Sequence, residues 1–144
     1  MLLTGCSYIY DITAELRGGE LVFTSGKDWF RERCVREIAV IAADRRDRAE
    51  AAPGDDASRG GFGMYWRDVV GYHCANRFPI GYGQRLAGEA LPEGQATGTV
   101  SAKPLKIGVV YDVQTVSGAT GYGSGRFVIR ADGTVQNFGT SKRD

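Results

Sequence analysis

Alternation of apolar and polar residues on either side of a glycine pair is the feature that most limits how this chain folds. The alternation runs over residues 10–17 and resumes over 21–23, and Gly18-Gly19 separates the two segments. Successive side chains of a strand point to opposite faces, so each segment predicts a half-buried strand. A glycine pair readily adopts the backbone angles of a two-residue hairpin turn. Residues 8–24 are therefore predicted to form a β-hairpin with its apolar face inward.

Comparable patterns elsewhere predict an all-β domain. The other segments that suit strands are 34–43, 62–74, 105–113 and 126–138, with a short helix as the alternative for 34–43. Asp132-Gly133 provides a second hairpin turn. Residues 76–83, around Pro79, predict a turn-rich corner. The 21 glycines are about twice ordinary usage, which fits strands joined by tight turns. Seven to eight strands without a long amphipathic helix predict an antiparallel β-sandwich, Ig-like or similar, or a partly open barrel.

Length and composition indicate one globular domain. The chain has 144 residues, of which 42% are hydrophobic and 24% charged, as in ordinary folded proteins. Its net charge of +1 argues against a dedicated nucleic-acid binder. No apolar run approaches the roughly 18 residues of a membrane span. Residues 44–61 are rich in charge and lack large apolar side chains, so we expect a mobile, solvated loop there.

The tetrapeptide Leu3-Thr4-Gly5-Cys6 resembles the lipobox of bacterial lipoproteins. The resemblance covers residues 3–6 alone. It implies that Cys6 carries a diacylglycerol and begins the mature chain, with residues 1–5 as a signal-peptide remnant and 6–144 as the domain. It also implies a bacterial cell-envelope location, and Ser7 fits the periplasmic face of the outer membrane. The leader of such a signal would lie upstream of Met1. The alternative is an incidental cysteine at a frayed N-terminus.

The cysteine count agrees with that resemblance. The chain has three cysteines, and if Cys6 carries lipid, Cys34 and Cys74 are left as a potential pair. A disulfide between them would suit an oxidising periplasm and would close a loop of about 40 residues. The alternative is two unrelated buried thiols, because a free cysteine behaves as a small hydrophobe.

Motifs for catalysis or cofactor binding are weak. The glycine-rich run 118–125 lacks the Lys-Ser/Thr pair of a phosphate loop and a following helix, so we predict a long hairpin loop. His73 is the only histidine, and neither a nucleophile arrangement nor a four-ligand zinc site forms around it in the sequence. We therefore predict no catalytic residue, no metal and no cofactor.

The carboxylates do not single out a catalytic pair. Those that we considered are Asp11, Glu15, Asp68, Asp112 and Asp132. Asp112 is the most interesting, because it lies on the polar face of a predicted strand. A hydrolase would require two of these acids to converge in one cleft.

Most aromatic side chains are expected in the core, because a β domain of this size needs bulky residues there. Four lie beside loop-forming residues and are candidate binding residues: Trp29, Trp66, Tyr82 and Tyr122. Exposed rings of this kind stack on sugars or anchor a protein partner.

Taken together, these observations predict a non-enzymatic envelope lipoprotein whose disulfide-stapled β-sandwich binds a protein partner in the periplasm, tethered to the membrane by lipid on Cys6. One alternative is a carbohydrate- or peptidoglycan-binding module that uses the loop aromatics. A second is a carboxylate-dependent hydrolase. Coplanar exposed rings would favour a glycan, whereas a contiguous apolar patch would favour a protein partner.

Overall fold

The computed structural model describes residues 8–25, 34–55, 63–71, 76–89, 91, 98–118 and 121–138. Within these ranges the elements are β1 (Tyr8–Arg17), β2 (Glu20–Ser25), β3 (Val35–Ala42), the short 3-10 helix η1 (Arg45–Asp47), β4 (Met64–Val69), β5 (Ile80–Gly81), β6 (Val110–Ser117), β7 (Gly121–Ile129) and β8 (Val135–Phe138). The predicted all-β class with seven to eight strands is confirmed.

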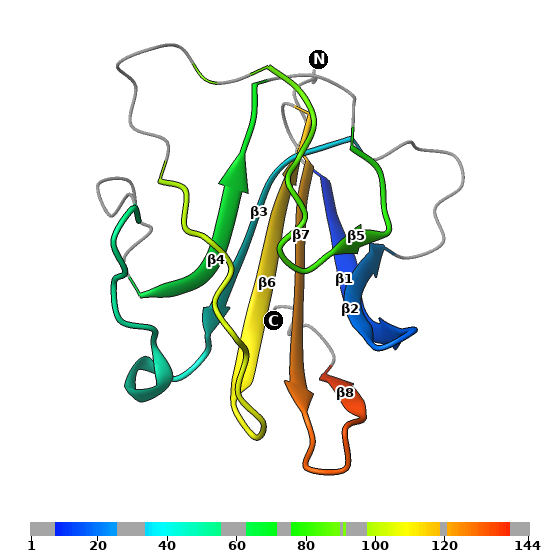
Figure 1. The fold of residues 1–144 in the computed structure, drawn as a ribbon. Coiled ribbons are helices and arrows are strands. Elements are labelled where there is room, and N and C mark those ends of the chain that lie inside the picture. Colours follow the sequence, from blue (N-terminus) through cyan, green and yellow to red (C-terminus); the bar gives the residue numbers. More distant parts are fainter. Residues whose placement is uncertain are drawn as a thin grey trace.

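All eight strands belong to one curled sheet (Figure 1). The strand order is β4-β3-β6-β7-β1-β2-β5, and β8 pairs with β7 as a branch. Every pair is antiparallel except β1 with β7, which is parallel. The sheet is therefore mixed and forms a half-barrel, which corresponds to the partly open barrel among the predicted architectures.

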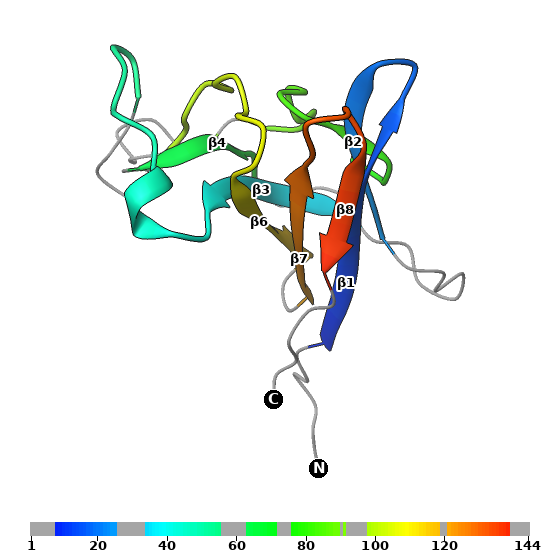
Figure 2. The same cartoon turned by 90° about the horizontal axis from the view of Figure 1, so that it is seen from below.

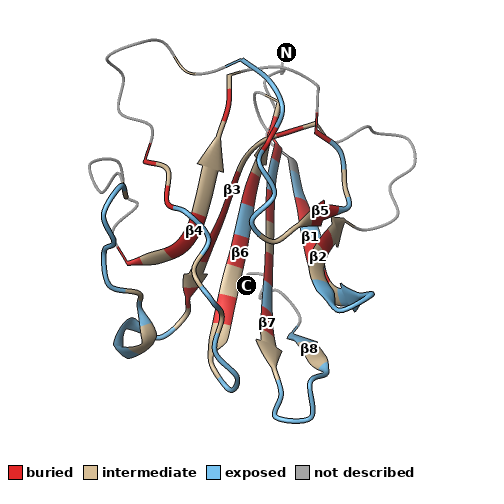
Figure 3. Ribbon diagram, viewed as in Figure 1, coloured by how far each residue is buried: buried red, intermediate tan, exposed pale blue. Residues whose placement is uncertain are grey.

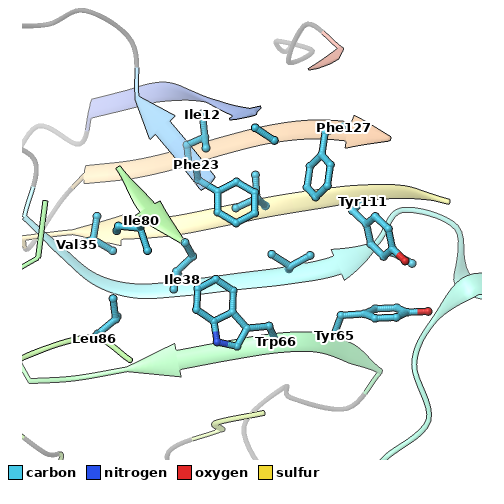
Figure 4. Packing of buried hydrophobic residues seen from close by; sticks show 14 of the residues in the cluster. Ile12, Phe23, Val35, Ile38, Tyr65, Trp66, Ile80, Leu86, Tyr111 and Phe127 are labelled. Atoms are coloured by element: carbon cyan, nitrogen blue, oxygen red, sulfur yellow. The ribbon is translucent and has the colours of Figure 1, made fainter. Parts of the chain in front are cut away.

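The concave side of the half-barrel holds the hydrophobic core. Burial alternates along β6 and β7, so that one face of each strand points inward (Figure 3). Tyr111 and Phe127 lie side by side with ring centroids 5.6 Å apart, and the Tyr65 ring meets Tyr111 edge-on at 5.0 Å (Figure 4). Phe23 and Ile38 are fully buried in the same cluster. These large side chains let a single curled sheet enclose a core without a second sheet.

A β-bulge in β4 supplies two of the core aromatics. Val40 pairs with Trp66 and Ile41 pairs with Met64, which leaves Tyr65 as an extra residue on β4. A bulge interrupts the alternation of faces, so consecutive residues can point the same way. Tyr65 and Trp66 are accordingly both 3% exposed.

The sheet branches at the middle of β7. The first half of β7 pairs with β1, and the second half pairs with β8, which lies between β7 and β1 in Figure 2. At Gly125 a Cβ would collide with the carbonyl oxygen of Ile12. Beyond this point Asn137 replaces a backbone bridge: its Nδ2 donates to the Ala14 oxygen and its Oδ1 accepts from the Ala14 N–H, both at 2.8 Å. The Asn137 side chain thus links β8 to β1 where β1 no longer pairs with β7.

Two boundaries differ from those expected. The run 118–125 is not a long hairpin loop, because β7 already begins at Gly121. Alternate glycines of this strand face the core, and Tyr10 lies over Gly123, where a Cβ would meet its ring. The predicted strand over 105–113 begins only at Val110. Gly108, with φ of +85°, turns the chain there and donates to the Ile129 oxygen at 2.8 Å.

The described part of the charged segment 44–61 has several fixed contacts. Asp44 caps η1 by accepting the Arg46 N–H at 2.9 Å. The Tyr65 hydroxyl donates to the Asp47 carbonyl oxygen at 2.7 Å. Asp55 forms an ion pair with Lys103 at 2.7 Å in which the carboxylate side chain is only 6% exposed. These contacts hold residues 44–55 against β4 and the segment that follows residue 98.

Gly125→Ala should strongly destabilise the fold, because the new methyl group would overlap the Ile12 carbonyl. We expect a loss on the order of 3 kcal/mol in the free energy of unfolding, measured by urea denaturation. Gly81→Ala is the matched control, since the nearest atom to its Cβ would be at an ordinary 3.8 Å. Equal unfolding midpoints for the two variants would show that β1 and β7 do not approach as described.

Candidate functional site

The five carboxylates that are candidates for hydrolysis lie on several different elements. Asp68 on β4 accepts the Leu86 N–H at 2.8 Å, and Asp132 in the β7–β8 turn accepts from Thr134. The other acids lie on β1 (Asp11 and Glu15) and on β6 (Asp112). In the part of the chain that the structure describes, no group of three His, Cys, Asp or Glu side chains gathers as metal ligands. His73 lies outside that part.

Among the four aromatic candidates, Tyr122 is the one that the structure places at the surface. Its side chain is 46% exposed, whereas Trp66 is buried in the core cluster. Tyr82 packs edge-on against Trp66 with centroids 5.2 Å apart, and its hydroxyl donates to the Lys103 carbonyl oxygen at 2.6 Å. Trp29 lies outside the described residues. The structure thus does not bring Trp66, Tyr82 and Tyr122 together as one exposed platform.

The convex side of the sheet carries three rows of side chains, which we call the outer face. Strand register places cross-strand partners in line, and neighbouring strands are about 4.8 Å apart. The rows are Val69–Glu37–Val116–Tyr122–Ile9, then Arg67–Ala39–Gln114–Ser124–Asp11, then Met64–Ile41–Asp112–Arg126–Phe138.

The first row contains a contiguous apolar stretch, the apolar row Ile9–Tyr122–Val116. Ile9 is 75% exposed and is the register partner of Tyr122, which in turn faces Val116. Scattered exposed apolar residues are normal on any protein, but contiguous ones mark interaction surfaces. The row lies at the end of the sheet where β1 begins. Sequence reasoning identified Tyr122 but missed Ile9, whose neighbour across the sheet comes from the far end of the chain.

A shallow cavity of about 270 Å³ adjoins the apolar row. It is lined on β7 by Tyr122 and Ser124, on β3 by Ala39, and on β4 by Met64, among others. The small side chains of Ala39 and Ser124 leave room between larger neighbours. The outer face therefore offers both a protruding apolar row and a hollow beside it.

Charges on the outer face largely neutralise one another. Arg126 donates to both oxygens of Asp112, at 2.7 and 3.2 Å, and this pairing raises the pKa of the guanidinium. Arg67 pairs with Glu37 at 2.8 Å. Because these pairs are internal to the face, a partner need not supply compensating charge there.

Of the two cysteines in the predicted disulfide, the structure describes Cys34 alone. Cys34 immediately precedes β3, whereas Cys74 and the lipidation candidate Cys6 lie outside the described residues. Val35 donates to the Asn76 carbonyl oxygen at 2.8 Å, and the Asn76 side chain donates back to the Val35 oxygen at 3.2 Å. The chain next to Cys34 therefore runs beside the chain two residues after Cys74. The bridge itself stays a prediction.

No protein-family model, curated protein or solved structure matches this chain. Over the described ranges, no helix is both long and apolar enough to cross a membrane.

Buried tyrosines should make the fold sensitive to alkali. Burial raises the pKa of Tyr111 to about 12 and also raises that of Tyr82. An unfolded tyrosine ionises near pH 10, so the folded state holds these protons more tightly and its stability falls as pH rises from 10 towards 12. Absorbance of tyrosinate at alkaline pH should show Tyr111 ionising only as the protein unfolds, with Tyr111→Phe shifting that unfolding to higher pH. Ionisation of every tyrosine near pH 10 with the fold intact would contradict this.

Proposed function

We propose that this chain is a non-enzymatic, lipid-anchored protein of the bacterial cell envelope, and that its half-barrel binds a protein partner through the outer face. The observation that carries the proposal is the apolar row Ile9–Tyr122–Val116, in which Ile9 and Tyr122 are exposed register partners and Val116 beside them is half-buried. Removing such a row from water favours association with apolar side chains of another protein.

A protein partner is better supported than a glycan. Sugar recognition by aromatic residues requires exposed ring faces, and of the candidates that the structure describes Tyr122 alone is exposed. A protein can cover the whole row and fill the adjoining hollow with one of its own side chains. The internal ion pairs of the outer face are compatible with such contact, since they leave little uncompensated charge to bury.

The anchor and the disulfide are supported by sequence and by backbone proximity. Cys6 lies two residues before β1 begins at Tyr8, so a lipid there would hold the end of the sheet that bears Ile9 close to the membrane. A disulfide between Cys34 and Cys74 would staple the start of β3 to the segment that Asn76 already hydrogen-bonds.

The partner proposal is tested by a paired substitution on the apolar row. Chemical cross-linking in the native envelope should give a specific cross-linked species that is lost in the Ile9→Ser, Tyr122→Ser variant. Ile107→Ser is the matched control, because Ile107 is 60% exposed but lies outside the outer face. Circular dichroism should show both variants folded. Loss of the species in the control, or its retention in the paired variant, would contradict the proposal.

The anchor and the bridge are tested by mass spectrometry of the protein exported from its complete reading frame. We expect a mature chain that starts at a diacylglycerol-modified Cys6 and a disulfide-linked peptide containing Cys34 and Cys74. Reducing that disulfide should lower the free energy of unfolding by about 4 kcal/mol, as expected for a closed loop of this size. Free thiols at both positions would refute the bridge, and an unmodified Cys6 in a chain that retains residues 1–5 would refute the anchor.

A further inference from the structure

A second cavity of about 270 Å³, which we call the edge pocket, lies beside β4 and shares only Arg67 with the outer face. Its walls come from β4, from the turn after β5 and from residues 99–102. Arg67 and Val100 exchange backbone hydrogen bonds at 3.0 and 2.9 Å, which fixes one wall to the strand. The Gln84 side chain accepts the Gly81 N–H at 2.9 Å, which fixes the turn. The pocket is therefore a formed feature of the fold.

One residue that lines the edge pocket carries a buried donor with no acceptor among the described residues. Trp66 is 3% exposed and lines the pocket, and its indole N–H makes no hydrogen bond with the described residues. Figure 4 shows the indole nitrogen on the side of β4, away from Phe23. A buried tryptophan N–H ordinarily has a partner, because an unsatisfied donor is costly in a low-dielectric interior. An acceptor brought by a ligand would satisfy it.

A cation lies in the same lining. Arg85 is exposed and makes no ion pair within the described part of the chain. Two other cations of this region are already in ion pairs: Arg67 pairs with Glu37 at 2.8 Å, and Lys103 pairs with Asp55 at 2.7 Å. The pocket therefore combines one buried neutral donor with one guanidinium that is available to a ligand.

We propose that the edge pocket binds a small molecule through its carboxylate, with the Trp66 indole N–H and the Arg85 guanidinium as donors. A carboxylate only accepts hydrogen bonds when ionised and pairs well with a guanidinium, so it matches this donor set. The cavity volume of about 270 Å³ lies just below the range of pockets that hold drug-sized ligands, so we expect a smaller molecule. The Asp68 carboxylate, which also lines the pocket, disfavours a polyanion. A sugar has no ring face to stack on, because the Trp66 ring is buried against Tyr82.

The test follows the Trp66 indole N–H of the full chain by NMR, with Trp66→Phe to assign its signal. Titration with sodium acetate and with N-acetylglycine, at constant ionic strength set by sodium chloride, should move this signal saturably. Arg85→Gln should weaken binding about tenfold or more, as expected for losing a hydrogen bond to a charged group. Arg46→Gln is the matched control, because Arg46 is exposed and lies outside the pocket.

Three results would overturn this assignment. The first is the absence of a saturable shift with either carboxylate. The second is an Arg85→Gln variant that binds as tightly as the wild type. The third is a shift of the Trp66 signal with glucose but not with acetate, which would indicate that the pocket binds a neutral sugar. Because the outer face does not enter this measurement, its result is separate from the cross-linking result for the apolar row.

Discussion

At Gly125 two strands approach so closely that no side chain fits between them, because a Cβ there would overlap the carbonyl oxygen of Ile12. Much of the half-barrel follows from this contact. It lets β1 leave β7 midway, and β8 takes its place along the second half of β7. The gap is closed by Asn137, whose amide donates to and accepts from the Ala14 backbone. A sheet that divides in this way curls and encloses its core from one side.

The glycines of β7 and the large residues of β1 fit each other. Tyr10 lies over Gly123, and its hydroxyl reaches the hydroxyls of Thr115 and Ser117 at 2.6 and 2.5 Å. Buried polar groups are tolerated when they are hydrogen-bonded to one another, and here three of them are. The cluster ties together β1, β6 and β7, which are distant in the sequence. The inward-facing glycines of β7 therefore have a structural role, which is to leave room for Tyr10 and its hydroxyl partners.

Local patterns in the sequence were sufficient for the hairpins and insufficient for the long-range pairing. The β1–β2 hairpin and the turn at Asp132-Gly133 follow from alternation and turn chemistry, which act over a few residues. The parallel pair of β1 and β7 joins the two ends of the chain, and no short pattern encodes it. The bulge at Tyr65 also escaped prediction, and it turns Trp66 inward. Of the candidate binding residues, the sequence thus identified the exposed Tyr122 but also offered Trp66, which is buried.

β1 is also the strand through which force would enter the molecule. It pairs with β2 along one edge and with β7 along the other, and a lipid on Cys6 would pull on its N-terminal end. Such a pull acts along the strand, whereas the ladder hydrogen bonds run across it. The bonds on both edges would then be loaded together in shear, instead of opening one after another as in an unzipping hairpin. If Cys6 carries lipid, β1 would therefore bear the resulting tension through hydrogen bonds loaded in shear.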